Sequence, residues 1–349
     1  MNSSKKKIFL FELSDIFDGQ VYLPYSSGVV WSYLNQKDFI KKNYELKDWF
    51  FAREKSDSII KKIKDPDILL FSCFMWNWSL NCEIAKEIKK KYPQVIVIFG
   101  GQHQPLQEKN KNFFKEHPFV DILSHHEGEL TVEEILRRAL EYKGDKKIFR
   151  DINGSTLNLE QIAYPAPPRK RMTSIEDQPS PFLDGSFDFI VKKNQAENKY
   201  NLHATVESAR GCPFGCAFCE IGDKYYQKIK TSYSKTKKEI DWISNNKIEY
   251  VTDANSNYGI LFDDDYDLAK YVCQKKAKTG YPKAYRVTWA KGQADKVLKI
   301  AKLLEKYDLQ KGMTIALQSM SQTVLDIIKR KNVSEGKLQD FISKYEKEN

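Results

Sequence analysis

Short apolar runs alternate with amphipathic segments over residues 5 to 145. The runs "IFLFEL", "DILLFSCF", "VIVIFGG" and "VDILSH" are rich in β-branched and aromatic residues, which is typical of buried parallel strands. The segments "SIIKKIK", "CEIAKEIKKKY" and "VEEILRRALEY" carry apolar residues at helical spacing. This alternation predicts that residues 1 to 145 form a doubly wound α/β domain, flavodoxin-like or Rossmann-like, with a parallel sheet of about five strands.

Candidate binding residues directly follow these predicted strands, because ligands of such sheets bind at the carboxyl ends of the strands. They are Ser72, then Gly100, Gly101, Gln102 and His103, and finally Glu127 and Gly128 within "HHEGE". The paired glycines are also ordinary turn residues. "GELTVEEIL" is better explained as a helix start with acids in its first turn than as a metal site. No GxGxxG follows the first strand, which weakens a dinucleotide-binding interpretation.

Residues 146 to 200 lose this periodicity and contain prolines at positions 165, 167, 168, 179 and 181. A structureless loop of that length is unusual in a compact protein. We therefore predict an ordered connector that lies on one or both of the flanking domains.

A second alternation covers residues 201 to 349. Candidate strands are "HATVESA", "IEYVTDAN", "AYRVTWAK" and "MTIALQS", and helical patterns follow at about 232–246, 263–279, 294–307 and 321–330. Four strand–helix units in this order predict a partial (β/α) barrel. In barrels of this kind the chemistry lies on the loops at the carboxyl ends of the strands.

The loop after the first of these strands, "ESARGCPFGCAFCEIG" at 207–222, holds three of the six cysteines. Structural zinc usually takes four ligands in two pairs, and no second pair follows at that spacing. Three thiolates on a four-iron cluster would leave one iron open to an outside ligand. Cys212, Cys216 and Cys219 are therefore candidate cluster ligands, and glycines at 211 and 215 allow close wrapping. Cys73, Cys82 and Cys273 lie in apolar or helical contexts and are predicted to be inert core residues.

The composition of the 349 residues, with 41% hydrophobic residues and a net charge of +10, predicts a globular protein of two to three domains. No apolar run is long enough to span a bilayer, and the N-terminus lacks the features of a signal peptide. We expect a cytoplasmic protein with reduced thiols. The lysines alternate with acids on helical faces, and "PPRKRM" at 167–172 is expected to be an exposed linker, so nucleic acid is not an expected partner.

The cysteine loop and several other segments of the chain resemble those of a known enzyme family. "RGCPFGCAFC" resembles the CxxxCxxC loop of radical S-adenosylmethionine (SAM) enzymes, and the chain ahead of it resembles their cobalamin-binding subgroup. "DILLFSCFMWNWS", "VIVIFGGQH", "VDILSHHEGELTVEEIL", "PSPFLDGSFD", "VTDANSNYGI" and "IALQSMSQTVLDIIKRKN" resemble further segments in the expected order. The resemblance covers about residues 8 to 335. The cysteine motif is highly specific, whereas the other segments are persuasive only as a series.

The resemblance implies a [4Fe-4S] cluster on the three cysteines, with SAM bound to the open iron and cleaved by an electron to methionine and a 5'-deoxyadenosyl radical. It implies that Phe218 faces the adenine. Asp253 and Asn255 after the second strand, and Gln318 and Ser319 after the fourth, are implied contacts to SAM or substrate. A strand-end turn and a helix cap explain these four residues equally well.

The resemblance also implies that cobalamin lies between the domains, against the strand-end residues from Ser72 to Gly128 named above, and gives a methyl group to a substrate radical. The DxHxxG signature that supplies a lower histidine ligand is absent. Residues 15 to 19 read "DIFDG", with phenylalanine at the histidine position. His103 is expected to contact the cofactor without ligating cobalt.

The implied activity is methyl transfer to an unactivated carbon of a small molecule or peptide, with flavodoxin or ferredoxin as electron donor. The family barrel has about six strand–helix units, and the sequence shows four. A short natural form, a truncated reading frame and a split enzyme completed by a second chain remain alternatives. Other functional alternatives are a radical rearrangement or cyclisation, a tRNA methylthiotransferase-like activity, and a non-catalytic subunit that binds cobalamin or the cluster.

Overall fold

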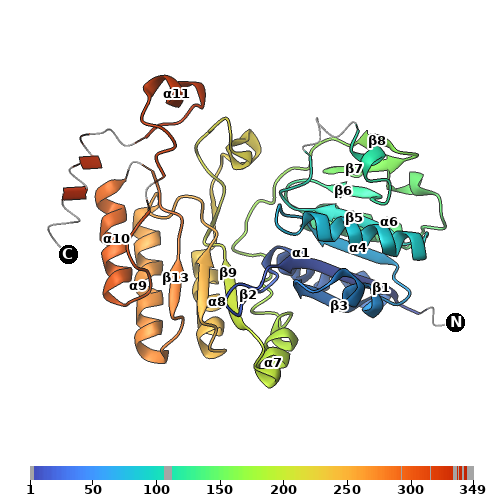
Figure 1. Cartoon of the computed structure of the whole chain (residues 1–349), viewed down its shortest axis with the longest axis horizontal. Helices are drawn as coiled ribbons and strands as arrows, with labels where there is room; N and C mark the ends of the chain where they lie inside the picture. Colours follow the sequence, from blue (N-terminus) through green and yellow to red (C-terminus); the bar gives the residue numbers. More distant parts are fainter. Residues whose placement is uncertain are drawn as a thin grey trace. The chain divides into compact units, whose positions relative to one another are not determined.

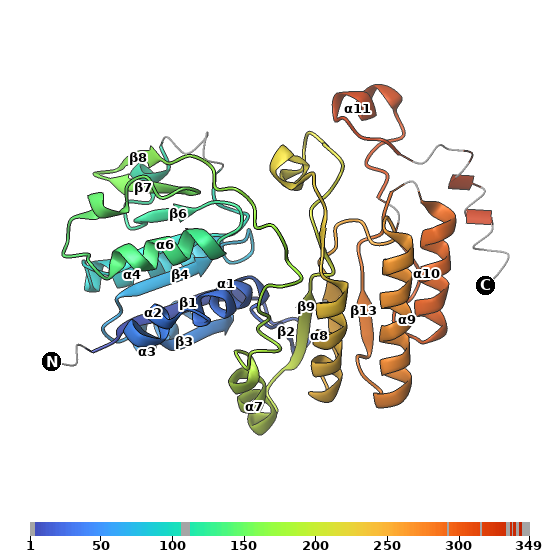
Figure 2. The same ribbon diagram turned by 180° about the vertical axis from the view of Figure 1, so that it is seen from behind.

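The computed structural model describes residues 4–105, 112–291, 293–314, 316–332, 336, 338–339 and 342–343. Contacts divide the chain into two compact units. The first comprises Met1–Met172 and Pro179–Tyr200, and the second comprises Thr173–Gln178 and Asn201–Asn349. Figure 1 and Figure 2 show a sheet flanked by helices in each unit. In the part of the chain that is described, no helix is long and apolar enough to cross a membrane.

The first unit contains a seven-stranded sheet in the order β3-β1-β4-β5-β6-β7-β8. Its strands are β1 (Lys6–Ser14), β3 (Tyr44–Ala52), β4 (Ile68–Ser72), β5 (Ile96–Gly100), β6 (Ile122–Ser124), β7 (Ser155–Leu159) and β8 (Ile162–Pro165). The first five are parallel, and their order is that of flavodoxin-like sheets. The predicted parallel α/β sheet is confirmed. β7 and β8 were missed, because they are short antiparallel strands within the predicted connector.

Helices cover both faces of this sheet. α1 (Tyr25–Asn35) packs against α6 (Glu129–Ala139), and α3 (Ser56–Lys62) packs against α4 (Trp78–Lys91). The remaining short elements are β2 (Gln20–Tyr22), α2 (Asp38–Asn43), α5 (Phe113–Glu116), the 3-10 helix η2 (Lys146–Phe149) and α7 (Asp188–Glu197). Burial on both faces explains why β4, β5 and β6 are almost continuously apolar.

Four phenylalanines form a row across the centre of the sheet. Phe11 is in register with Phe50 on one side and with Phe71 on the other, and Phe71 is in register with Phe99. The centroids of the Phe11 and Phe71 rings are 4.2 Å apart, and the Phe71 and Phe99 centroids are 5.0 Å apart. Each such pair contributes about 0.5–1.5 kcal/mol beyond the buried area. The row therefore fixes the register of the strands that carry the candidate binding residues.

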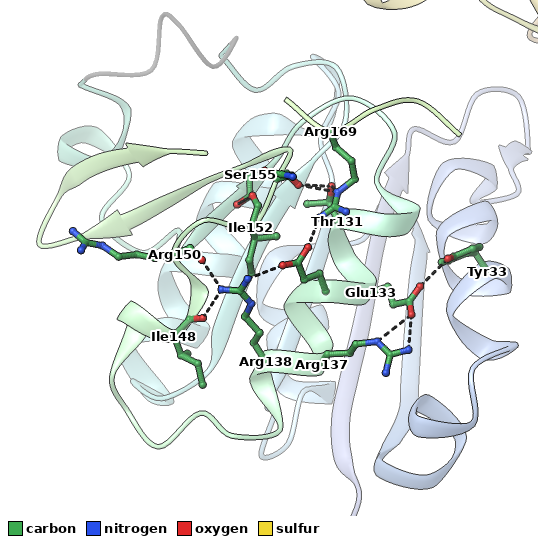
Figure 3. A network of polar contacts seen from close by, with 12 residues as sticks. Tyr33, Thr131, Glu133, Arg137, Arg138, Ile148, Arg150, Ile152, Ser155 and Arg169 are labelled. Atoms are coloured by element: carbon green, nitrogen blue, oxygen red, sulfur yellow. Dashed lines mark hydrogen bonds and ion pairs between the residues drawn. The ribbon is translucent and has the colours of Figure 1, made fainter. Parts of the chain in front are cut away.

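Most of the predicted connector packs on the first unit through a polar network (Figure 3). Arg138 of α6 donates to the carbonyl oxygen of Ile148 at 3.1 Å and to that of Arg150. Arg169 Nε donates to Thr131 Oγ1 at 3.1 Å, and its guanidinium also pairs with Glu134. The side chain of Arg169 is therefore held against α6, and Met172 is buried, so the prediction that "PPRKRM" is an exposed linker is wrong at these two residues.

In the second unit, β9 (Asn201–Val206), β12 (Tyr250–Asp253) and β13 (Ala284–Arg286) are parallel neighbours in the order β13-β12-β9. α8 (Tyr233–Asn245), α9 (Phe262–Thr279) and α10 (Ala294–Lys306) stand side by side (Figure 1). A two-stranded ribbon of β10 (Ala209–Arg210) and β11 (Lys230–Thr231) follows β9. Three of the predicted strand–helix units are thus seen.

The fourth predicted strand, "MTIALQS", is not seen in residues 313–314 and 316–319, and residue 315 lies outside the described residues. Gln318 has a left-handed φ of 66°, which interrupts an extended strand. Side chains, not a neighbouring strand, bind this segment: Asn332 Nδ2 donates to the carbonyl oxygens of Leu317 at 2.6 Å and Ser319 at 2.8 Å. The helix that follows, α11 (Gln322–Ile327), is shorter than predicted.

Candidate functional site

The three clustered cysteines lie on one closed loop at the carboxyl end of β9. The ribbon of β10 and β11 joins the two ends of the loop, with Ala209 opposite Thr231 and Arg210 opposite Lys230. Both views show the loop projecting beyond the end of β9, on the same side as α11 (Figures 1 and 2). Ala217 N donates to the Ile328 carbonyl oxygen at 2.9 Å and so ties the loop to the segment after α11.

Two glycines are required for the close path of this loop. A Cβ atom on Gly211, whose φ is 121°, would lie 2.6 Å from the Tyr226 carbonyl oxygen. A Cβ on Gly222 would lie 2.6 Å from the Cys216 carbonyl oxygen. Gly215, in contrast, has only ordinary contacts. The sequence correctly indicated Gly211 and missed Gly222, which lies after the last cysteine.

All three loop cysteines are free, as a cluster site requires. Cys212 and Cys216 are buried and Cys219 is exposed. No group of three His, Cys, Asp or Glu side chains within the described ranges is arranged to hold a metal ion. Cluster ligands each bind a different iron, so they lie farther apart than the ligands of one ion. Three thiols on one loop match the number of protein ligands that a four-iron cluster with one open iron would take.

The other three cysteines lie outside the loop, and two of them are in the core, as predicted. Cys73 and Cys273 are buried in the core, and Cys82 is partly buried. Burial raises the pKa of the Cys82 thiol to about 12 and that of Cys273 to about 11. A thiol with so high a pKa is a poor nucleophile and a poor metal ligand at neutral pH.

A buried polar network follows the carboxyl end of β12. Asp253 Oδ1 accepts from the backbone N–H groups of Ser208 at 3.1 Å and Asn255 at 3.0 Å, and its Oδ2 accepts from Tyr285 Oη at 2.9 Å. Asn255 Nδ2 donates to Asp265 Oδ1 at 3.2 Å. Burial raises the pKa of Asp253, and it raises that of Asp265 to about 6. Asp253 and Asn255 thus shape the strand end from inside the protein.

The remaining predicted SAM contacts are at the surface or near it. The Phe218 side chain, between Cys216 and Cys219, is 54% exposed. Gln318 is exposed and Ser319 is partly buried, in the segment that Asn332 holds. Phe218 and Gln318 are therefore accessible to a ligand, whereas Asp253 and Asn255 are not.

In the first unit the structure brings together the predicted residues after β4 and β5. Ser72 is in register with Gly100, and Cys73 N donates to the Gly100 carbonyl oxygen at 2.8 Å. Gly101 has a φ of 93°, and a Cβ there would lie 2.5 Å from the Cys73 carbonyl oxygen. The paired glycines therefore do not only form a turn, because Gly101 also allows the loops after β4 and β5 to approach closely.

Gln102 and His103 follow Gly101 directly, and both residues are exposed. His103 N donates to the Cys73 carbonyl oxygen at 3.1 Å, and its ring meets Trp78 edge to face at 5.1 Å between centroids. Both side chains are accessible to a ligand at the carboxyl edge of the sheet.

Glu127 and Gly128 precede α6. Glu127 Oε1 accepts from Arg171 Nε at 3.2 Å, and its Oε2 accepts from Met172 N at 2.8 Å. Gly128 is the N-cap residue of α6. Glu127 therefore ties Arg171 and Met172 of the connector to the residues before α6, and the expected helix start is confirmed.

Known proteins resemble the chain over most of its length, although no protein-family model matches it. It is 31% identical over 329 residues to cobalamin-dependent radical SAM methyltransferase TokK of Streptomyces tokunonensis, covering 94% of this chain and 47% of TokK. It is 30% identical over 347 residues to 2-(S-pantetheinyl)-carbapenam-3-carboxylate methyltransferase of Streptantibioticus cattleyicolor, covering 99% of this chain and 49% of that protein. Over nearly its whole length the chain is therefore similar, at about 30% identity, to about half of each of these two methyltransferases.

A more distant relative is anaerobic magnesium-protoporphyrin IX monomethyl ester cyclase of Cereibacter sphaeroides. The identity is 22% over 298 residues, which cover 82% of this chain and 46% of the cyclase. The chain spans about half the length of each of these relatives.

Two features of the site were missed by sequence reasoning. Asn257 is buried and donates from Nδ2 to Cys212 Sγ at 3.2 Å. Large apolar side chains are exposed after β1 and β4: Ile16, Phe17, Met75 and Trp76. Tryptophan and phenylalanine in the loops that follow buried strands were available as a signal, whereas the contact of Asn257 depends on the path of a distant loop.

His125, the first residue of "HHEGE", is paired within the core. Its Nε2 lies 2.8 Å from Thr156 Oγ1, and burial lowers its pKa to about 4. The folded pKa is below the ordinary value of 6.5, so neutral His125 stabilises the fold above pH 6.5, and this contribution is lost as the pH falls toward 4.

The free energy of unfolding of the first unit is expected to fall between pH 6.5 and pH 4. We expect this fall to be about 3 kcal/mol smaller in His125→Gln than in the native protein. Chemical unfolding over this pH range measures the difference, with exposed His103→Gln as the control. Equal pH dependence in the native and His125→Gln proteins would contradict the expectation.

Proposed function

We propose that this chain is a cobalamin-dependent radical SAM methyltransferase that binds a [4Fe-4S] cluster on Cys212, Cys216 and Cys219. The observation that carries the proposal is the set of three free cysteines on one closed loop after the first strand of the second unit. When bound, the cluster supplies the electron that cleaves SAM to a 5'-deoxyadenosyl radical, and cobalamin supplies the methyl group. The substrate is a small molecule or a peptide with an unactivated carbon, and flavodoxin or ferredoxin is the electron donor.

The residues of the second unit have distinct roles in this proposal. Cys212, Cys216 and Cys219 hold the cluster, and the exposed ring of Phe218 packs on the adenine of SAM. Gln318 and Ser319 offer polar groups to SAM or to the substrate. Asp253 and Asn255 act indirectly, because they are buried and hold the strand end in place.

In the first unit, cobalamin would bind at the carboxyl edge of the sheet. Gly100 and Gly101 allow close approach there, Ser72 lies in register beside them, and Gln102 and His103 are exposed. The four exposed apolar side chains after β1 and β4 fit the large apolar faces of a corrin ring.

The products of SAM test this proposal. The chain is purified, reconstituted anaerobically with iron, sulfide and hydroxocobalamin, and incubated with SAM and a reductant. We expect retained corrinoid, 5'-deoxyadenosine from radical cleavage, and S-adenosylhomocysteine from removal of the methyl group. A chain that retains neither iron nor corrinoid would contradict the proposal and would favour a function without these cofactors.

The second candidate function is a radical cyclisation with the same cofactors, which the similarity to the cyclase of Cereibacter sphaeroides favours. The same incubation separates the two candidates. Formation of 5'-deoxyadenosine without S-adenosylhomocysteine would support cyclisation or rearrangement over methyl transfer.

A further inference from the structure

The side chain of Asn257 contacts a candidate cluster ligand from inside the protein. Asn257 Nδ2 donates to Cys212 Sγ at 3.2 Å, and both residues are buried. A cluster-bound cysteine sulfur is a thiolate and can only accept a hydrogen bond, so the amide must present its N–H group to it. This contact suits the bound form of Cys212.

A chain of hydrogen bonds holds Asn257 in this position. Asp265 Oδ1 accepts from Asn255 Nδ2 at 3.2 Å, and Asn255 Oδ1 accepts from Asn257 N at 3.0 Å. Asp265 itself accepts from the backbone N–H of Gly259 at 2.7 Å and from Tyr233 Oη at 2.7 Å. The backbone of Asn257 is therefore held in place before a cluster binds, and the buried side chain extends from this fixed point, which reduces the free-energy cost of the contact.

Asn257 is not explained as an ordinary core residue. Its Oδ1 is buried and has no hydrogen-bond partner among the residues that the structure describes. An unpaired buried carbonyl oxygen costs about 1–3 kcal/mol, and an apolar side chain of similar size would avoid that cost. The contact that Asn257 makes with Cys212 gives a reason for an amide here.

We infer that Asn257 is a positioning residue that orients Cys212 and raises the reduction potential of the cluster. A hydrogen bond to a ligand sulfur stabilises the reduced cluster more than the oxidised one, because the extra electron makes the sulfur more negative. The inference rests on the proposed function, since it requires a cluster on Cys212.

The test is a redox titration of the reconstituted chain, followed by electron paramagnetic resonance of the reduced cluster. Asn257→Leu removes the donor but keeps a similar volume, so it adds no water beside the cluster. We expect the equilibrium constant for one-electron reduction to fall about tenfold, which is a midpoint shift of ~59 mV to lower potential. Asn257→Thr, which keeps a hydroxyl donor, is expected to retain a potential closer to that of the native protein.

Asn158→Leu is the matched control. Asn158 is a buried asparagine of the first unit whose Nδ2 donates to the Val120 carbonyl oxygen at 2.7 Å. Its replacement is expected to leave the midpoint potential unchanged. Equal potentials for the native and Asn257→Leu proteins, each with a complete cluster, would overturn the inference and leave the proposed function intact. Failure of the native chain to bind a cluster would overturn both.

Resonance Raman spectra of the oxidised cluster provide a second measurement that does not depend on the potential. An N–H group bound to Cys212 exchanges in D₂O, so an iron–sulfur stretching band of the native protein is expected to shift. That shift is expected to be lost in Asn257→Leu. An isotope shift of equal size in the variant would mean that another donor binds the sulfur and would overturn the inference.

Discussion

Replacement of Cys216 by alanine is expected to abolish binding of the four-iron cluster and to lower the release of 5'-deoxyadenosine by at least about 100-fold. Loss of residues that merely support a metal ligand already costs 10–100-fold, and Cys216 would be a ligand itself. Iron and sulfide content, visible absorption and product release after anaerobic reconstitution measure the effect.

Cys82→Ser is the control for this experiment. Cys82 lies on α4 of the other unit, and burial raises the pKa of its thiol to about 12. We expect this variant to bind as much iron as the native chain. If Cys216→Ala retained a full four-iron cluster, the assignment of the ligands would be wrong.

Replacement of Gly101 by alanine is expected to destabilise the first unit by about 3 kcal/mol and to prevent corrinoid binding. The new Cβ would lie 2.5 Å from the Cys73 carbonyl oxygen and 2.7 Å from its backbone nitrogen, at a φ of 93°. The left-handed backbone costs about 1–2 kcal/mol, and the backbone overlap adds to it. Chemical unfolding and equilibrium dialysis with hydroxocobalamin measure the two effects.

Gly280→Ala is the control that separates the steric overlap of the new Cβ from the strain of a left-handed backbone. Gly280 follows α9 with a φ of 80°, and a Cβ there would meet nothing within 4 Å. We expect a destabilisation of about 1 kcal/mol and unchanged corrinoid binding. Equal corrinoid affinity in native, Gly101→Ala and Gly280→Ala proteins would show that the predicted cobalamin edge is misplaced.

Buried parallel strands were the most predictable part of this fold. Runs such as "VIVIFGG" combine β-branched residues with a glycine stop, and this local signal gave β5 and the close approach at Gly101. β3 was not named from its sequence because "YELKDWFFA" contains Glu45, Lys47 and Asp48 and so lacks a continuous apolar run, and β7 and β8 were hidden in a proline-rich stretch. The fourth strand of the second alternation was wrongly predicted, because a left-handed Gln318 and the side chain of Asn332 decide the path there.

The candidate site was predictable to the extent that it is local in sequence. The three cysteines lie within eight positions, so their spacing alone indicated their chemistry. Besides bonding to one another, Asp253, Asn255 and Asn257 bind partners 10 to 47 positions away, and no local sequence pattern predicts such contacts. Their burial and the hydrogen bond to Cys212 required the structure.

The most direct test of the central claim, that three cysteines leave one iron open for SAM, is electron–nuclear double resonance of the reduced cluster. The reconstituted chain is mixed with SAM carrying ¹⁵N in its amino group, and unlabelled SAM is the comparison. We expect a ¹⁵N coupling to the cluster spin, because the amino group would bind the open iron. A complete, reduced cluster that shows no ¹⁵N coupling with saturating SAM would contradict it.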